Sequence, residues 1–311
     1  MSRKTLNTII KMLLGVTILW ISLSIMDSRK ETSRSPTNSV KDAFTGLDST
    51  TITGFMIKSP DGSVTELSNA DDGWKVNGYL VDETSLSKFW NAIDENQVGN
   101  VIANNAGNHG RLGLSEDSTW MVEIMGPDSQ QPRILVGNSG PTYPSVFTRL
   151  SDKDEVVVVS GDLRGAVTQN LTEWRNKTII TTDTSAVKSI LLEYDDETYL
   201  LQRLDTTWAV DGQTADAAAL IGITAELSHM EASGFLDVGN SPSDQNQRSI
   251  IAMDDSGNIL NQLVLSGEGS TRHVQTPKTE VVFEIPSWKF DRIVPESFMF
   301  IQNDDVDPVR Q

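Results

Sequence analysis

Short runs of alternating apolar and polar residues occur along most of the chain after residue 51. The same succession of predicted strands and a helix occurs twice. In the first copy, residues 52–57 and 63–67 alternate as strands around a Pro-Asp-Gly turn, and a third short strand follows at residues 74–76. Asp82 then suits a helix N-cap. A helix with one apolar face is predicted after it, because the next large apolar residues are Leu86, Phe89, Trp90 and Ile93.

The second copy repeats this order of elements. Its strands are predicted at residues 187–194, 198–202 and 208–210, and its helix at 216–230. Four strand candidates follow each helix, at residues 120–124, 133–136, 146–150 and 155–159, and at 250–253, 259–265, 271–275 and 280–285. A short helix then ends each copy, at 163–171 and 287–293. We therefore predict an α+β fold: an N-terminal transmembrane helix followed by two similar α+β domains, each a mainly antiparallel sheet with one covering helix.

The first part of the chain has a different pattern. Residues 6–26 are apolar apart from Lys11 and a few small polar residues, and this is roughly the length that spans a bilayer. Arg3 and Lys4 precede the segment, so the positive-inside rule predicts a cytoplasmic N-terminus. A cleaved signal peptide is the alternative, and it would export the body equally. We predict a single-pass protein of the bacterial inner membrane with a periplasmic body.

These patterns divide the chain into five parts. Residues 1–26 form the cytoplasmic N-terminus and anchor, and residues 27–50 a tether rich in Ser, Thr and charge. The first repeat is predicted at 51–182, the second at 183–298, and an acidic tail at 299–311.

Charge and cysteine content exclude several classes of protein. The 311 residues carry a net charge of -18. Residues 1–34 hold six basic and two acidic residues, so the remainder carries -22 and should repel nucleic acid. There are 0 cysteines, which excludes disulfides, thiolate metal sites and thiol catalysis. We expect a partner with a basic surface, bound through contacts that weaken with salt.

Candidate catalytic and metal-binding residues are few. Ser85 and Lys88 fit the Ser-x-x-Lys pattern of penicillin-interacting enzymes, but the accompanying motifs are absent, so a solvated helix face is the preferred interpretation. His109, His229 and His273 are not spaced as metal ligands on one element.

The remaining patterns also have structural interpretations. Acidic clusters at residues 152–155, 254–258 and 303–307 lack the spacing of a calcium loop. The glycines at 267 and 269 lack a third glycine and a helix. Periodicity places Trp74, Trp90 and Trp208 on buried faces rather than on a sugar platform. We therefore predict no catalytic, cofactor-binding or metal-binding residue and no cofactor.

Four motifs resemble a bacterial family of membrane-anchored proteins with a domain of unknown function, often encoded beside ABC-type transporters of the gliding-motility kind. They are the strand at residues 74–76, the Arg-Leu-Gly-Leu of residues 111–114, the Ile-Leu-Val-Gly of 134–137, and the run from 146 through 159 to the Trp-Arg-Asn-Lys of 174–177. Leu112 stands where the family usually has Tyr or Phe, and the second copy lacks a clear Gly-Leu and the Trp-Arg-x-Lys. The resemblance covers most of residues 51–293 and implies no catalytic residue.

The prediction for function follows from location, architecture and resemblance. We expect a non-enzymatic accessory or scaffolding protein of an envelope complex. The expected partner is an inner-membrane complex, with an ABC-type permease as the candidate implied by the resemblance, and no nucleic acid. The alternative is an envelope enzyme, or a ligand-binding module with a pocket between the two repeats.

Overall fold

The computed structural model describes residues 39–45, 47, 51–94, 97–126, 132–194, 196–205, 207–210, 212–236 and 239–300. The predicted anchor at residues 6–26 and the acidic cluster at 303–307 lie outside them. No helix of the described ranges is long and apolar enough to cross a membrane. The chain divides into two units, Met1–Trp174 and Arg175–Gln311, and each is described by itself.

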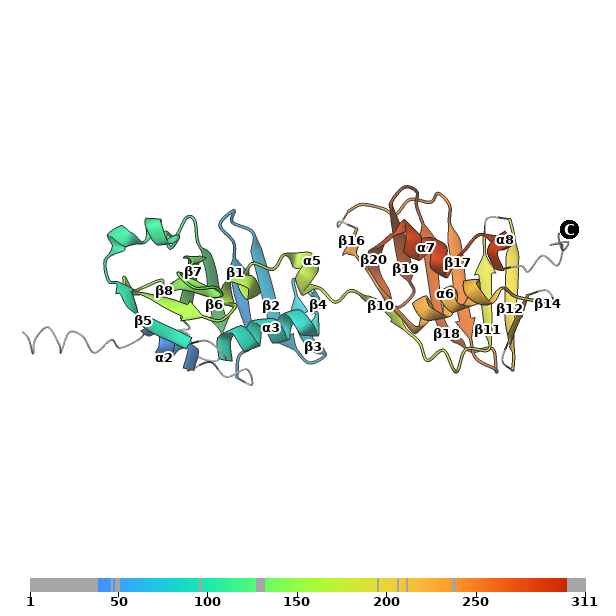
Figure 1. Ribbon diagram of the computed structural model, residues 1–311, viewed down its shortest axis with the longest axis horizontal. Helices are drawn as coiled ribbons and strands as arrows, with labels where there is room; N and C mark the ends of the chain where they lie inside the picture. Colours follow the sequence, from blue (N-terminus) through green and yellow to red (C-terminus); the bar gives the residue numbers. More distant parts are fainter. Residues whose placement is uncertain are drawn as a thin grey trace, which may run out of the picture. The chain divides into compact units, whose positions relative to one another are not determined.

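Unit 1 is built on one antiparallel sheet (Figure 1). Its elements are α2 (Ser39–Thr45), β1 (Gly54–Lys58), β2 (Val64–Ala70), β3 (Gly73–Val76), β4 (Tyr79–Leu80), α3 (Glu83–Asp94), β5 (Gln97–Ala103), η1 (Ala106–Asn108), η2 (Gly110–Leu112), β6 (Trp120–Met125), β7 (Arg133–Ser139), β8 (Ser145–Leu150), β9 (Val156–Ser160), α4 (Leu163–Val167) and α5 (Leu171–Trp174). The nine strands lie in the order β4-β3-β2-β1-β6-β7-β8-β9-β5.

Unit 2 is built in the same way. Its elements are β10 (Thr178–Thr181), β11 (Ser189–Glu193), β12 (Thr198–Leu204), β13 (Thr207–Val210), β14 (Gln213–Thr214), α6 (Ala217–Ser228), β15 (His229–Glu231), β16 (Gly234–Phe235), β17 (Arg248–Met253), β18 (Ile259–Ser266), β19 (Thr271–Thr276), β20 (Thr279–Pro286), α7 (Ser287–Ile293) and α8 (Ser297–Phe300). The large sheet has the order β14-β13-β12-β11-β17-β18-β19-β20-β16, and β10 pairs with β15 in a separate two-stranded sheet.

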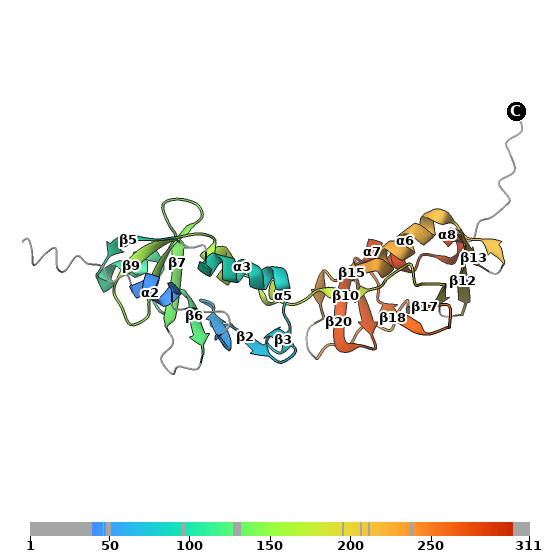
Figure 2. The same ribbon diagram turned by 90° about the horizontal axis from the view of Figure 1, so that it is seen from below.

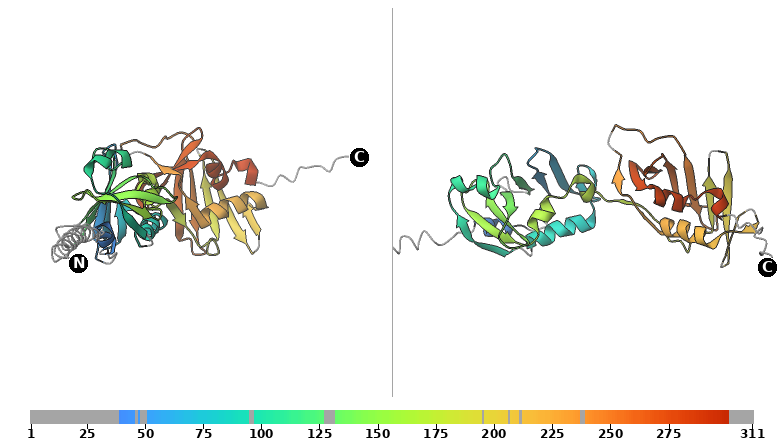
Figure 3. Two further views of the ribbon diagram at one scale, coloured as in Figure 1. Left: turned by 60° about the vertical axis from the view of Figure 1, so that its left-hand side comes forward. Right: turned by 45° about the horizontal axis from the view of Figure 1, so that its top comes forward.

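The two large sheets therefore have the same strand order. In each unit a four-strand meander is followed by a 12-residue helix, then by the strand of the opposite edge, and then by the four strands between them. Figures 2 and 3 show α3 and α6 each lying along one side of its own sheet. An aspartate caps both helices: Asp82 accepts from the Ser85 amide at 2.8 Å, and Asp216 from the Ala218 amide at 2.8 Å.

The core of unit 1 is centred on aromatic rings. Phe55 of β1 stacks on Phe89 of α3 with ring centroids 4.1 Å apart, and the fully buried Trp174 of α5 lies 6.1 Å from both rings. Val40 and Phe44 of α2 belong to the same core, although their segment was expected to be a tether.

The buried core of unit 2 is mainly aliphatic and contains fewer aromatic side chains than that of unit 1. Leu220, Ile223 and Leu227 of α6 pack among the buried residues of the sheet. Ile190 of β11 and Phe290 of α7 lie in the same cluster. Each unit therefore has a hydrophobic core of its own.

The predicted fold class is wrong. The structure is mainly antiparallel β-sheet, and each 12-residue helix packs on only part of a nine-stranded sheet rather than covering a small one. The reason is a non-local pairing: β1 lies against β6, with Phe55 opposite Ile124, so the meander and the later strands form one sheet. The transmembrane helix of that prediction has no counterpart among the described residues.

The tryptophans also differ from the expectation. Trp74 and Trp208 occupy the second position of β3 and β13, and both are half-buried at the margin of the core instead of inside it. Trp90 is half-buried as well. Trp174, which the sequence pattern did not place in the core, is the fully buried one.

Candidate functional site

Ser85 and Lys88 hold α3 against its neighbouring helices. The Ser85 hydroxyl donates to the carbonyl oxygen of Glu173 in α5 at 2.8 Å. The Lys88 ammonium donates to the carbonyl of Gly165 in α4 at 3.2 Å and lies 3.7 Å from a carboxylate oxygen of Asp162. A serine nucleophile requires a base within hydrogen-bonding reach. None of these three contacts joins the serine to the lysine, and all of them hold α3 against α4 and α5.

The three histidines lie on different elements. His109 is buried between η1 and η2, and its Nε2 lies 3.1 Å from the carbonyl oxygen of Asp154, which ties this loop to the turn after β8. His273 lies in β19 opposite Glu284 of β20. Across the described part of the chain, no three His, Asp or Glu side chains are grouped as metal ligands.

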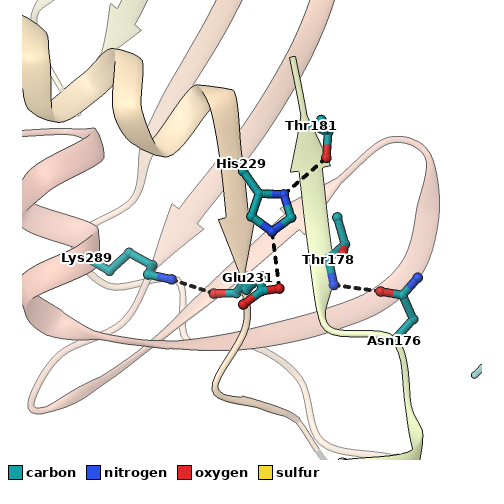
Figure 4. Close-up of polar contacts among 6 residues, drawn as sticks. All are labelled: Asn176, Thr178, Thr181, His229, Glu231 and Lys289. Atoms are coloured by element: carbon teal, nitrogen blue, oxygen red, sulfur yellow. Dashed lines mark hydrogen bonds and ion pairs between the residues drawn. The ribbon is translucent and has the colours of Figure 1, made fainter. Parts of the chain in front are cut away.

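His229 has the most suggestive surroundings. Figure 4 shows it between β10 and β15 in a small polar cluster, which comprises Asn176, Thr178, Thr181, His229, Glu231 and Lys289. Its Nδ1 lies 3.3 Å from the Thr181 hydroxyl, and its Nε2 lies 3.1 Å from a carboxylate oxygen of Glu231. The Lys289 ammonium donates to the Glu231 carbonyl at 2.7 Å. The order hydroxyl, imidazole, carboxylate is that of a catalytic triad.

The register of the two strands accounts for this cluster without catalysis. Thr181 lies directly opposite His229 in the β10–β15 ladder, and Glu231 is two residues along the same face. Cross-strand and same-face neighbours of this kind interact on many sheet surfaces. The side chains of His229 and Glu231 are more than half exposed, so water competes for each hydrogen bond. The cluster therefore fixes β15 to β10, and Lys289 attaches α7 to it.

A hollow of about 670 Å³ lies beside the turn between β1 and β2. Met121 and Leu135 contribute apolar lining, and charged side chains of both signs surround it: Lys58, Asp61, Glu116, Asp117, Arg133 and Asp152. Arg133 is engaged by Glu123, with 3.1 Å between Nη2 and Oε1. Four carboxylates against two cations give the hollow an acidic balance that suits a cationic group.

Asp61 is the most strongly perturbed group of that hollow. The Ser59 hydroxyl donates to its carboxylate, the Ser63 amide does so at 2.9 Å, and these bonds lower the pKa of Asp61 from 3.8 to about 2. Such a carboxylate is a permanent anion at neutral pH and a poor general base. Its local role is to close the Ser59–Ser63 turn.

Two motifs of the family resemblance meet in the structure. A Cβ added to Gly137 would lie 2.5 Å from the backbone oxygen of Leu112 and 2.9 Å from the Leu114 side chain. Gly113 has a φ of +72°, and a Cβ there would lie 2.5 Å from the Asn138 side-chain oxygen. The Gly-Leu loop and β7 can therefore approach each other closely only because both positions lack a side chain.

A buried arginine organises the carbonyl groups of each unit. Arg149 of β8 donates to the carbonyls of Leu114, Leu150, Ser151 and Lys153 at 3.0–3.2 Å. Burial lowers the pKa of Arg149, which the nearby carboxylates of Glu116 and Asp154 oppose. Arg248 of β17 donates to the Val294 carbonyl at 2.7 Å and pairs with Glu296. Both arginines hold loops in place.

Sequence reasoning singled out His229 but not its partners. Thr181 and Glu231 become its neighbours through the pairing of β10 with β15, which are about 50 residues apart, and neither strand was predicted. Arg149 and Arg248 were also missed, because a charged residue within or just before a predicted strand is normally assigned to an exposed position.

A comparison with family models matches residues 77–249 to a family described as a domain of unknown function, DUF4340. The matched region begins after β3 and ends in β17, so it includes parts of both units. No curated protein and no solved structure matches the chain.

Proposed function

The chain belongs to the DUF4340 family, and we propose that it is a membrane-tethered, non-enzymatic accessory or scaffolding protein of a bacterial envelope complex. The proposed partner is an inner-membrane complex, with an ABC-type permease as the candidate. The proposed anchor is residues 6–26, whose sequence is apolar over roughly the length of a bilayer span, and residues 27–50 are the tether.

The repeated strand order carries this proposal. Two units with the same nine-stranded order give one chain two related bodies, each with its own core. Such a chain can contact two partners, or one partner at two places. Tethering to the membrane raises the effective concentration of both units near membrane proteins, so weak individual contacts suffice.

The hydrogen bonds of the candidate catalytic side chains within the protein support a role in binding partners rather than in catalysis. Ser85 and Lys88 bind backbone carbonyls of α5 and α4, and His109 binds the Asp154 carbonyl. His229 joins two strands at an exposed surface. A structural bond already occupies each of these groups.

Crosslinking in intact cells tests the proposal. Alanine replaces Ser85, Lys88, His109, His229 and His273 one at a time in the full chain. We expect every variant to keep the crosslinks to the envelope partner and the associated cellular function. A single replacement that abolishes function while abundance, fold and crosslinks persist would show that the protein is an enzyme.

The proposed location has a separate test. With the N-terminus in the cytoplasm and the body in the periplasm, a phosphatase fused after Gln311 should be active, because the enzyme folds only after export. The chain should also remain in the membrane fraction after an alkaline carbonate wash. A soluble, shortened product would contradict the anchor and leave export intact.

Ligand binding is a second candidate function, and the hollow beside the β1–β2 turn favours it. Its acidic balance predicts a ligand with a cationic group. A screen of small cationic compounds by thermal shift should then find binders whose shift disappears in Asp152→Asn. Shifts that persist in that variant would place the binding elsewhere.

A further inference from the structure

Helices α3 and α6 are the same element in two units, and their residues correspond one to one. Each has 12 residues, follows the fourth strand of its sheet and is capped by an aspartate. Aligning the caps Asp82 and Asp216 places Phe89 opposite Ile223, both of them buried. The two helices therefore present the same positions to solvent, except that exposed Lys88 corresponds to the buried Gly222.

The outer faces of the two helices differ in chemistry. On α3 the exposed residues are all polar: Glu83, Thr84, Ser87, Lys88, Asn91 and Asp94. On α6 the exposed residues are Ala217, Ala218, Ile221, Ala225 and Ser228, none of which is charged. We call the first four of these residues the α6 surface. Ile221, whose counterpart is Ser87, is 67% exposed.

Helix α6 is thus apolar on both sides, which is unusual for a helix at a protein surface. An amphipathic helix shows polar residues to water, and a helix that is apolar all round is normally buried. Leu220, Ile223 and Leu227 already fill the core. The α6 surface lies on the opposite side and is uncovered by the described residues.

The elements beside α6 extend its apolar character. Figures 1 and 3 show α7 and α8 next to α6. Trp288 of α7 is 57% exposed and Met299 of α8 is 50% exposed. Arg292 of α7 is held by the buried Glu226 of α6, with 3.4 Å between Nη1 and Oε1, so it contributes little free positive charge to this region.

Charge decides what covers the α6 surface. Unit 2 has 22 acidic and 10 basic residues, a net charge of -12. A second copy of the chain and an anionic lipid surface would both be repelled, whereas a basic protein segment would be attracted. Exposed Asp291 of α7 supplies a carboxylate for its basic residues, whereas Glu296 is already paired with Arg248.

We propose that the α6 surface binds an amphipathic helix of a partner protein, with small or branched apolar residues on one side and Lys or Arg at its borders. This rests on the proposed function, for which it names a contact site. Ala217, Ile221 and Ala225 form one ridge at i, i+4 and i+8, and the alanines on either side of Ile221 let a second helix approach closely. A helix of 12 residues is about 18 Å long, so the partner segment contacts it over roughly three turns.

Photocrosslinking in intact cells tests the site in the full chain. p-Benzoylphenylalanine replaces Ile221 in one strain and Ser87 in another, which gives a matched control on α3. We expect an adduct from position 221 to a segment rich in Lys or Arg with helical apolar spacing, identified by mass spectrometry, and no such adduct from position 87.

Substitutions then measure the contact. Ile221→Ser should lower co-purification of the crosslinked partner about tenfold, as for a central apolar residue of an interface. Ile221→Lys should lower it further by repelling a basic segment, and Ser87→Lys should leave it unchanged. Ala218→Lys is a second variant with the same expected loss should Ile221→Lys fail to fold. Thermal unfolding of the purified variants checks that the fold is kept.

Each other outcome overturns the inference in a distinguishable way. In one outcome, position 221 crosslinks only a second copy or lipid, or gives no adduct, while other positions of the body crosslink an envelope partner. This outcome would refute binding at the α6 surface and leave the proposed function standing. An envelope partner that no position of the body crosslinks would refute the proposed function as well.

Discussion

At the scale of single residues, the chemical groups of this chain are used to hold turns and loops. Asp61 accepts hydrogen bonds from Ser59 and Ser63 and closes the turn between β1 and β2. Arg149 gathers the carbonyls of two loops. The resulting charges are fixed by local structure and are not poised for proton transfer.

The Asp61 turn gives a prediction about pH. The carboxylate has a pKa of about 2 in the folded chain against 3.8 for the free group, and the Ser59 hydroxyl is the largest cause. A lowered folded pKa stabilises the fold above pH 3.8, and this contribution is lost as the pH falls toward 2. Ser59→Ala should raise the Asp61 titration midpoint toward 3.8 in a carboxyl NMR titration. Asp183, whose pKa is lowered chiefly by the Ser185 hydroxyl, is the internal control. A midpoint that stays near 2 in the variant would contradict this cause.

The tryptophans give a prediction about stability. Trp174 is fully buried against Phe55 and Phe89, so Trp174→Ala should lower the free energy of unfolding by about 3–5 kcal/mol. Trp74→Ala and Trp208→Ala should each cost less, because both rings are half-buried. Urea unfolding followed by fluorescence and circular dichroism measures all three. Equal costs would mean that Trp74 and Trp208 are core residues as the sequence pattern suggested.

At the scale of elements, the local patterns were predictable and the pairing was not. The apolar spacing of residues 86–93 predicted α3, and Asp82 was identified as its cap. β5 was missed, because its ladder with β9 shifts register between Val98 and Ala103 and so breaks the alternation. The joining of β1 to β6 depends on residues some 65 positions apart. No local pattern contains that information, which is why the predicted fold class was wrong.

Local sequence patterns also failed to reveal which residues of the candidate sites lie together. The candidates Ser85, Lys88 and the histidines were found from their residue types, but their partners come from other elements. The α6 surface is a different case. A run of Ala, Leu and Ile without a charged residue on the outward positions was visible in the sequence, but which side faces the core is decided by the sheet.

The close contact between β7 and the Gly-Leu loop gives a prediction at this scale. Gly137→Ala should destabilise the chain by roughly 1–3 kcal/mol, because its Cβ meets the fixed backbone oxygen of Leu112. Gly113→Ala should also destabilise, through its φ of +72° and the Asn138 side chain. Adding Asn138→Ala should recover part of the loss for Gly113→Ala and none for Gly137→Ala. Equal recovery in both double variants would show that the loop rearranges instead.

At the scale of the whole molecule, the two units have the same strand order and separate cores. The units nevertheless differ in core composition, since stacked aromatic rings lie at the centre of unit 1 and the core of unit 2 is mainly aliphatic. They also differ in what their helices show to solvent. The two units therefore share a strand order but differ in packing and in surface.

Separate cores predict separate unfolding. Phe89→Ala in unit 1 and Ile223→Ala in unit 2 remove corresponding buried side chains, each at a cost of about 2–5 kcal/mol. Differential scanning calorimetry of the full chain should show two transitions, and each variant should lower only the transition of its own unit. One transition that both variants lower equally would contradict independent units.

In each unit one edge strand of the large sheet, β5 or β16, comes many residues before the strand with which it pairs. β5 pairs with β9 and β16 pairs with β20, so neither edge forms until residues 156–160 or 279–286 are present. Synthesis and export deliver a chain from its N-terminus. For an exported chain, each unit therefore stays open while it passes through a narrow channel, and its final strand pairing forms only when nearly all of its residues have emerged. The first unit can close while the second is still in transit.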